Sequence, residues 1–355
     1  MNHAVVSAIT PLTTDEALRG SRRMRAIVLT EPQAVALVDD WPDPEPGPDE
    51  VVVAIRAVGL CGSDLSVYDG DRAVPSLPWV MGHEGGGEIV ATGSAVVDRH
   101  VGQRVVIEPN YCCFDCPACR NGRTSACGNR RVVGMNHPGL LAERVAVPAR
   151  FAWPVPAAVA DGALGCTEPL AVARTAVRRS GVTPGDRCLV VGAGSQGLFT
   201  CQTLLAAGAQ VSVTEPHEGR LELAERLGAK RAEAADVEPF PMVFDTAGVP
   251  AAWETSLRAV AGGGTVVMIG MSRTPVSVST RELVQRQVTI VGSLIYDHPT
   301  DFSATVAAVA DGSVAPEQVL QAGAHPEHAG TAFAQAREAP GKSWIDLSSW
   351  QEEAA

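Results

Sequence analysis

Short apolar runs separated by Gly and Pro fill the first part of the chain. The run at residues 51–58 follows the turn-forming stretch 45–50 and is typical of a β-strand. Further runs of this kind are found at residues 24–29, 88–91, 104–107 and 143–147. Together they predict an irregular, β-rich domain that extends to about residue 155.

The pattern changes near residue 185, where strands begin to alternate with helices. A compact apolar run at 188–191 leads into a glycine turn, a helical stretch to Ala207 and a second strand at 211–214. The helix that follows has apolar residues at helical spacing, namely Leu221, Ala224 and Leu227. Later strands are expected at residues 243–245, 265–269 and 289–291. Such alternation predicts a parallel, doubly wound sheet.

Two stretches stand outside this alternation. The interval 230–242 is too short for a full strand–helix–strand step, so we expect one peripheral helix to be trimmed. The tail from about residue 301 has a mixed helical pattern and ends in a strand-like run at 343–347. We expect this last strand to rejoin the first domain.

Composition and charge narrow the class of protein. A chain of 355 residues with 46% hydrophobic and 19% charged residues suits a soluble protein of two domains. The net charge of −12 argues against nucleic acid or an anionic membrane as a partner, because both demand a basic face. No apolar run approaches the ~20 residues that span a bilayer. Residues 1–23 lack the apolar centre of a secretory signal, so we expect a cytoplasmic protein with a disordered extension there and Met24 as an alternative start.

A glycine turn between a predicted strand and a predicted helix indicates a nucleotide site. Gly192 permits the tight turn, Gly194 lets the backbone approach a pyrophosphate, and Gly197 packs the helix on the strand. The amides at the start of that helix then face the phosphate charge. Glu215, at the end of the next strand, would accept hydrogen bonds from ribose hydroxyls and repel a 2′-phosphate. Glu215 therefore favours NAD over NADP, although the positive charge of Arg220 nearby weakens this inference.

The cysteines are clustered. Nine cysteines without a signal peptide point to free thiols or metal ligands, and five of them fall between Cys112 and Cys127. The spacing Cys113-x2-Cys116-x2-Cys119-x7-Cys127 matches a closed tetrahedral zinc site. Cys112 fits this spacing less well and is interpreted as a bystander.

A second candidate metal site is dispersed along the chain. Cys61, His83 with Glu84, and Glu168 supply a thiolate, an imidazole and two carboxylates from three segments. A thiolate, an imidazole and a carboxylate or water compose a catalytic zinc site that keeps room for substrate. Glu84 and Glu168 compete for the third position, and the residues alone leave that choice open.

These blocks, in this order, resemble the zinc-containing medium-chain dehydrogenases over nearly everything after Met24. The stretch 168–194, which opens Glu168-Pro-Leu-Ala-Val, is similar to the sorbitol dehydrogenase branch of that family. The chain also contains the pattern Gly82-His83-Glu84-x2-Gly87-x5-Gly93-x2-Val96, which resembles the family's zinc signature without a gap. The resemblance implies an α/β protein with a GroES-like β-rich catalytic domain and a Rossmann domain with a doubly wound parallel sheet.

The resemblance also implies a division of the chain. We expect a catalytic domain at 24–175 with a structural-zinc lobe at 110–130, and an NAD-binding Rossmann domain at 176–298. Residues 299–355 are then expected to return to the catalytic domain.

Further residue roles follow from the resemblance. Cys61 and His83 would bind a catalytic zinc with Glu84 or Glu168, and the four lobe cysteines would hold a structural zinc. In hydride transfer assisted by that zinc, Ser63 would relay the substrate proton outward and Asp64 would orient a ligand imidazole. Glu84 is counted among the catalytic residues as well as the ligands. The candidate cofactor-binding residues are Gly192, Gly194, Gln196, Gly197, Glu215, Arg220, Gly270 and Ser293.

Three positions depart from the pattern of the sorbitol enzymes. Ser66 stands where many relatives have a proton-passing histidine, so the last proton step would use water or the cofactor ribose. Val67 and Ile295 stand where a tyrosine and an arginine are expected to meet the polyol. Sorbitol itself is therefore an unexpected substrate, and the opening Cys61-Gly-Ser-Asp-Leu-Ser also resembles dehydrogenases that act on cyclitols.

The predicted function is an NAD-dependent, zinc-dependent oxidoreductase acting on a secondary alcohol, polyol or cyclitol. Two zinc ions per chain, a small-molecule substrate and a homodimer or homotetramer are expected. One rival is a zinc-free quinone reductase of the same superfamily, and the other is a non-enzymatic zinc-ribbon interaction protein. The cysteine, histidine and carboxylate set argues against the first, and an acidic chain with a nucleotide fold argues against the second.

Overall fold

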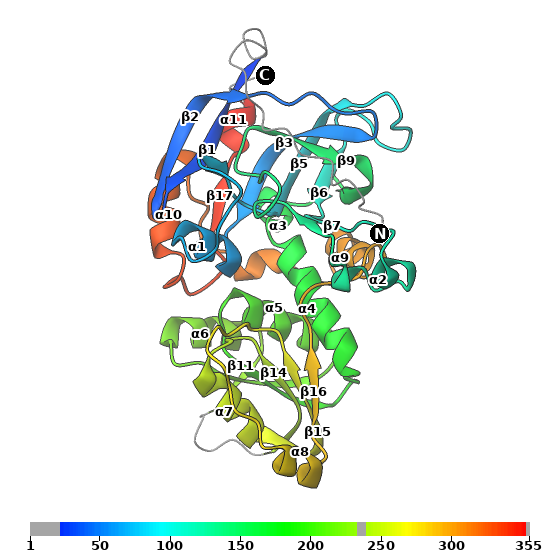
Figure 1. Cartoon of the computed structure of the whole chain (residues 1–355). Helices are drawn as coiled ribbons and strands as arrows, with labels where there is room; N and C mark the ends of the chain where they lie inside the picture. The colour runs from blue at the N-terminus through cyan, green and yellow to red at the C-terminus, as the bar shows by residue number, and fades with distance from the viewer. Residues whose placement is uncertain (1–21, 233–238, 353–355) are drawn as a thin grey trace, which may run out of the picture.

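The computed structural model describes residues 22–232 and 239–352. The extension predicted at 1–23 lies almost entirely outside the described residues, and the first strand, β1, begins at Arg23. Figure 1 shows a β-rich unit above an α/β unit. This is the predicted combination of a β-rich domain with a second domain of strands and helices.

The β-rich unit is built on antiparallel sheets. A six-stranded sheet has the order β10-β6-β5-β3-β17, with β9 also paired to β3, and a three-stranded sheet has the order β2-β1-β4. The six-stranded sheet consists of β3 (Glu50–Gly59), β5 (Glu84–Thr92), β6 (Arg104–Ile107), β9 (Arg144–Pro148), β10 (Ala152–Pro154) and β17 (Trp344–Asp346). The other sheet consists of β1 (Arg23–Glu31), β2 (Ala34–Pro42) and β4 (Trp79–Val80). The strands predicted in this part of the chain are confirmed, and the closing strand β17 rejoins the first unit by pairing with β3.

The β-rich unit also contains short helices and a small lobe. The lobe contains β7 (Asn110–Tyr111), α2 (Pro117–Arg120), the 3-10 helix η1 (Thr124–Ala126) and β8 (Arg131–Val132), and β7 pairs with β8. The remaining short elements are α1 (Gly62–Tyr68), η2 (Ala149–Phe151), α3 (Asp161–Leu164), η4 (Pro326–His328), α10 (Ala329–Gln335) and α11 (Ser348–Glu352).

The α/β unit contains a wholly parallel six-stranded sheet of order β13-β12-β11-β14-β15-β16. Its strands are β11 (Arg187–Val191), β12 (Gln210–Thr214), β13 (Lys230–Arg231), β14 (Phe240–Asp245), β15 (Val260–Met268) and β16 (Thr289–Gly292). The predicted doubly wound sheet is confirmed. Its order reverses between β11 and β14, so a ligand crevice is expected beyond the carboxyl ends of these strands. The prediction of a trimmed helix at 230–242 falls partly on residues 233–238, which lie outside the described residues.

Helices cover this sheet and link the two units. They are α4 (Thr167–Ser180), α5 (Ser195–Ala206), α6 (Glu218–Arg226), α7 (Pro250–Ala259), α8 (Thr280–Arg286), α9 (Thr300–Ala310) and η3 (Pro316–Val319). The core around β11 and α5 includes Leu170 from α4 and Val309 from α9, so both helices are packed against the parallel six-stranded sheet. Within the described residues, no helix is both long and apolar enough to cross a membrane.

Candidate active site

Three predicted metal ligands meet at one place in the β-rich unit. Cys61 is the residue that caps the start of α1, and His83 and Glu84 stand where β5 begins. One ligand atom from each of the three lies within 4.8 Å of the others. The structure therefore brings together a thiol, an imidazole and a carboxylate that are separated along the chain.

Asp64 hydrogen-bonds to both segments that carry Cys61 and His83. Its Oδ1 lies 3.0 Å from Nδ1 of His83 and accepts from the Gly82 amide at 3.3 Å, and its Oδ2 accepts from the Cys61 amide at 3.0 Å. Burial of the His83 ring would lower its pKa, but Asp64 and Cys61 outweigh burial and raise the pKa well above its usual value. The surroundings therefore favour positive charge at this point, whether on the imidazole or on a metal cation.

Glu84 has a buried partner that the sequence analysis did not identify. Lys342, in the segment leading to β17, forms an ion pair with Oε2 of Glu84 and donates to the Leu60 carbonyl oxygen at 2.9 Å. Neither Glu84 oxygen has a hydrogen bond of regular geometry within the described residues. Burial would lower the pKa of Lys342, but Glu84 and Cys61 outweigh it and raise the pKa, so the ammonium stays charged.

Glu168 stands beside this group in the first turn of α4 but is not one of its three members. Burial raises the pKa of the Glu168 carboxyl to about 7, with His83 opposing the shift and Glu84 adding to it. The Asn110 amide nitrogen lies 3.5 Å from its Oε1, and the neighbouring Tyr296 hydroxyl acts to lower the pKa of the carboxyl. Asn110 and Tyr296 were not identified from the sequence.

These residues fit a zinc ion. Sulfur from cysteine, nitrogen from histidine and oxygen from a carboxylate are the ligands that zinc takes in proteins. The Glu84 carboxylate is 0% exposed. A buried carboxylate without regular hydrogen bonds is costly unless a cation compensates it. Lys342 supplies one such charge, and a metal at Cys61 and His83 would supply another.

The candidate proton path is short. Ser63 Oγ lies 3.4 Å from Nε2 of His83, on the side of the imidazole opposite Asp64. Ser66 donates its hydroxyl back to the Gly62 carbonyl at 3.1 Å. Val67 is buried in the core of the β-rich unit, and Ile295 is partly buried against another apolar cluster. Neither of these last two positions supplies a polar group.

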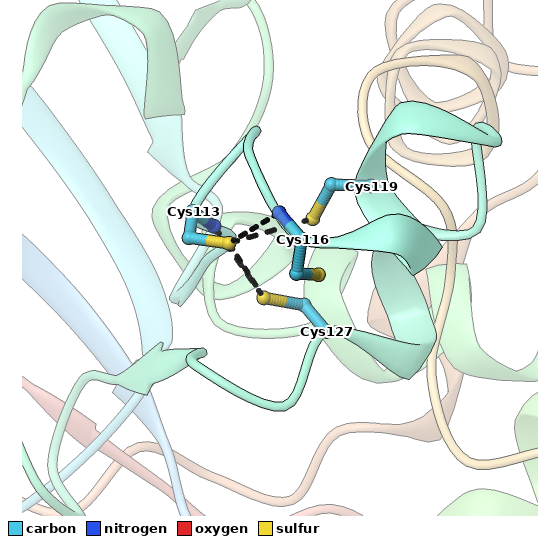
Figure 2. A group of neighbouring side chains, drawn as sticks. All are labelled: Cys113, Cys116, Cys119 and Cys127. Atoms are coloured by element: carbon cyan, nitrogen blue, oxygen red, sulfur yellow. Dashed lines mark hydrogen bonds between the residues drawn. The ribbon is translucent and has the colours of Figure 1, made fainter. Parts of the chain in front are cut away.

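Figure 2 shows the four lobe cysteines turned toward one another. The sulfur atoms of Cys113, Cys116, Cys119 and Cys127 lie within 4.8 Å of one another. Cys113 Sγ is 3.5 Å from Cys127 Sγ and 4.0 Å from Cys119 Sγ. The structure leaves Cys112 outside this group, in the core of the β-rich unit.

The local backbone and burial shift the pKa values of these thiols in different directions. Amides of Asp115 and Cys116 point at Cys113 and lower the pKa of its thiol to about 6. Burial instead raises the pKa of Cys119 to about 12, helped by the neighbouring thiols. Four thiols this close cannot all ionise without a positive charge between them, and a tetrahedral zinc ion supplies it. The four residues fit a structural zinc.

The glycine turn has the geometry expected of a phosphate site. Gly192 has a φ of 95°, which disfavours any residue with a Cβ. A Cβ on Gly197 would lie 2.0 Å from the Gly192 carbonyl oxygen, so only glycine lets α5 pack this closely. Gly194 caps the start of α5, and a Cβ there would meet nothing within 4 Å. The open space beside Gly194 fits a pyrophosphate at a helix N-terminus.

Glu215 directly follows β12 and reaches back to this turn. It accepts from the amide of Ala193 at 2.7 Å and from that of His217 at 3.0 Å. Arg220 lies 3.9 Å from Glu215 Oε1, and its guanidinium donates to the carbonyl oxygens of Arg337 and Ala339. Arg220 is therefore held in place rather than free to turn toward a phosphate.

The other candidate cofactor residues have varied surroundings. The Gln196 amide points at the Pro169 carbonyl oxygen at 3.4 Å. Gly270 packs against Gly248, because a Cβ on it would lie 2.2 Å from the Gly248 nitrogen. Ser293 is buried, and its hydroxyl accepts from Arg179 at 3.4 Å. Of these three, only Gln196 belongs to the glycine turn itself.

Comparison with known proteins adds to this geometry. Residues 47–157 match the model of the alcohol dehydrogenase GroES-like domain, and residues 197–311 match that of the zinc-binding dehydrogenase. An L-galactonate-5-dehydrogenase from Escherichia coli (strain K12) is 34% identical, over 78% of this chain and 85% of that protein.

Two solved structures are similar over most of their length. A short chain alcohol dehydrogenase from Escherichia coli, complexed with NADH, has a TM-score of 0.84 and 26% identity, and the match covers 92% of this chain and 100% of that one. A cobalt- and zinc-bound alcohol dehydrogenase from Pyrobaculum aerophilum has a TM-score of 0.83 and 26% identity, with the same coverage. The chain belongs to the zinc-containing medium-chain dehydrogenases, the family of alcohol and polyol dehydrogenases that joins a GroES-like domain to a nucleotide-binding sheet.

Proposed function

We propose that this protein is a zinc-dependent oxidoreductase that transfers a hydride between a secondary alcohol, polyol or cyclitol and NAD. The observation that carries the proposal is the group of Cys61, His83 and Glu84, whose ligand atoms lie within 4.8 Å of one another. The same chain has the complete glycine turn of residues 192–197 and, directly after β12, the acidic residue Glu215. A zinc-free quinone reductase needs no such ligand group, and an interaction protein needs no nucleotide crevice.

Two zinc sites are proposed. Cys61, His83 and Glu84 would hold the catalytic ion, with Glu168 as the neighbouring carboxylate that can replace Glu84 in the ligand set. Cys113, Cys116, Cys119 and Cys127 would hold a structural ion with no open position. When bound, the catalytic zinc supplies a Lewis acid that lowers the pKa of an alcohol, and NAD supplies the hydride acceptor.

The chain's own residues orient the reactants and carry the proton. Asp64 holds Nδ1 of His83, which leaves Nε2 for the metal. Ser63, 3.4 Å from that Nε2, is the proposed first carrier of the substrate proton. The Ser66 hydroxyl proton is engaged by Gly62, so we propose that the proton continues from Ser63 through water or the cofactor ribose.

The cofactor proposal rests on Glu215. Its carboxylate is held beside the glycine turn by two backbone amides, where it can accept from ribose hydroxyls. A 2′-phosphate at the same place would meet a like charge. We therefore propose a preference for NAD, with Gly192, Gly194, Gln196 and Gly197 lining the site and Gly270, Ser293 and Arg220 as its more distant members.

We further propose that residues 24–175 form the catalytic unit and residues 176–298 the NAD-binding unit, with the return completed at β17. The lobe's closely spaced, unpaired thiols support a reducing compartment such as the cytoplasm.

A homo-oligomer is proposed on the open edge of the nucleotide sheet. β16 is the last strand of that sheet, and Ile290 on it is exposed. Val284 and Leu294, close to it in sequence, are also exposed. An open apolar edge strand invites pairing with another chain, and a second copy of this protein would supply it by two-fold symmetry. We propose a homodimer formed along β16, alone or as half of a homotetramer.

The direct test of the reaction is a substrate panel. Polyols, cyclitols, sugar acids and secondary alcohols are offered with NAD, and NADH formation is followed by absorbance. We expect turnover with at least one secondary alcohol, and none in His83→Ala with NAD binding retained in a calorimeter. Equal turnover in His83→Ala would contradict the proposed metal site, and failure to bind NAD would contradict the cofactor assignment.

A further inference from the structure

Tyr296 lies at the meeting point of three segments. It follows β16 in the loop that leads to α9, and it is 1% exposed. The Asn110 side-chain amide donates to the Tyr296 hydroxyl at 2.7 Å. The same amide nitrogen lies 3.5 Å from Oε1 of Glu168, so one donor from the lobe lies between the hydroxyl and the carboxylate. Because the hydroxyl oxygen accepts from Asn110, its proton is left for another acceptor, and the neighbouring Glu168 carboxylate, whose pKa the hydroxyl lowers, can take it.

The residues on the far side of Tyr296 attach its loop to the cysteine lobe. Asp297 accepts from the Ser125 amide at 2.9 Å, and the His298 amide donates to the Thr124 hydroxyl at 2.6 Å. The His298 ring lies 2.8 Å from the Glu108 carboxylate. Because three bonds hold residues 297 and 298, the backbone at Tyr296 has little freedom to move its hydroxyl away from Glu168.

Glu168 needs such a partner. Its carboxylate is buried, and the neighbouring Asn110 amide is at the outer limit of a hydrogen bond. Rotation about the terminal torsion of a glutamate is otherwise soft. A proton donated by the Tyr296 hydroxyl would therefore select the rotation of this carboxylate beside His83 and Glu84.

We propose that Tyr296 is a positioning residue of the active site, which orients Glu168 toward the catalytic metal and is itself held by the cysteine lobe. This rests on the proposed function, because it takes the Cys61, His83 and Glu84 group as the site of reaction. Partners of this kind, once removed, typically cost about 10- to 100-fold in activity or metal affinity.

The test compares Tyr296→Phe with Tyr111→Phe. Tyr111 is a matched control, because it is also buried and belongs to the lobe strand β7, and its hydroxyl has no partner among the described residues. Each variant is measured for kcat and KM with an active alcohol, for NADH binding, and for the visible spectrum of the protein with cobalt at the catalytic site. The Tyr296→Phe change is also made in a Glu168→Gln background.

We expect Tyr296→Phe to lower kcat by about tenfold or more, to shift the cobalt spectrum and to leave NADH binding unchanged. Tyr111→Phe should match wild type. In the Glu168→Gln background the Tyr296→Phe effect should largely vanish, because the two residues act as a unit. A wild-type cobalt spectrum and kcat in Tyr296→Phe, or full additivity with Glu168→Gln, would overturn the proposal. If the wild-type protein is inactive on every alcohol but Tyr296→Phe still shifts the cobalt spectrum, the dehydrogenase function is overturned and the positioning role of Tyr296 is upheld.

Discussion

The ammonium of Lys342 is buried against the carboxylate of Glu84, with side chains 1% and 0% exposed respectively. Removal of one member of a buried ion pair leaves an uncompensated charge and costs about 3–5 kcal/mol. Lys342→Met should therefore lower the free energy of unfolding by about this amount, measured by denaturant unfolding of the protein without zinc in the catalytic site.

The other lysine of the chain is the control for this change. Lys230 is exposed in β13, so Lys230→Met should leave stability unchanged. Adding Glu84→Gln to Lys342→Met should recover part of the loss, because the unpaired charge is gone. Equal stability of Lys342→Met and Lys230→Met would show that the Lys342–Glu84 pair has no structural importance.

The lobe cysteines should separate into four ligands and one bystander. Cys119→Ala removes a ligand, so zinc content should fall from about two ions to about one per chain, with a clear loss of thermal stability. Cys112→Ala, next to the group but outside it, should keep both ions. Metal analysis of the two variants decides the point, and unchanged zinc in Cys119→Ala would remove the structural site.

Cofactor preference should respond to Glu215. Two like unit charges about 4 Å apart repel by about 4 kcal/mol at an effective dielectric of about 20. Even a third of that, after screening, is about tenfold in affinity. Glu215→Ser should therefore shift the ratio of kcat/KM for NAD and NADP toward NADP by about tenfold.

Arg220 adds little to this shift, because two carbonyl oxygens hold its guanidinium. Glu218→Ser is the control, since Glu218 opens α6 but points to Arg231. Equal or better kcat/KM with NADP in the wild-type enzyme would mean that another residue sets the choice.

Two serines in α1 should behave differently. Ser63→Ala removes the proposed proton carrier and should lower kcat by about 100-fold or more. Ser66→Ala should change kcat little, because that hydroxyl is bonded to the Gly62 carbonyl oxygen. Steady-state rates of both variants check this. A large loss in Ser66→Ala with none in Ser63→Ala would reverse the proposed path.

The oligomer should depend on β16. Ile290→Lys places a charge on the open apolar edge, so the protein should shift toward the monomer in light scattering. Val97→Lys is the control, because Val97 is 94% exposed in the other unit. A wild-type monomer, or an Ile290→Lys variant that keeps the wild-type mass, would contradict a dimer formed through this strand.

The sequence was informative where a signal is local. The glycine turn lies between a strand and a helix and has only six residues from Gly192 to Gly197, and the structure has the same turn. The lobe cysteines are also close in sequence, so their spacing alone predicted the group in Figure 2. No local pattern joins Cys61 to His83, so their pairing rested on the residue types that occur together with a nucleotide fold and on the family resemblance.

Residues that act at a distance left no such signal. Lys342 and Tyr296 come from segments that fold back from the far end of the chain, and a single lysine or tyrosine has no spacing to recognise. The choice between Glu84 and Glu168 also depended on tertiary structure. Glu84 directly follows His83 and joins its group, while Glu168 comes from α4 and lies outside that group, with the Asn110 amide 3.5 Å from its Oε1.

In the proposed reaction, an alcohol is oxidised at the site of Cys61, His83 and Glu84 with the help of a zinc ion. The most direct test is the rate of NADH formation from an active alcohol before zinc is stripped with a chelator, after stripping, and after zinc is restored. We expect full activity before stripping, near-complete loss after it and recovery when zinc is restored, with no recovery in His83→Ala. Undiminished NADH formation by the zinc-free protein would contradict the proposed reaction.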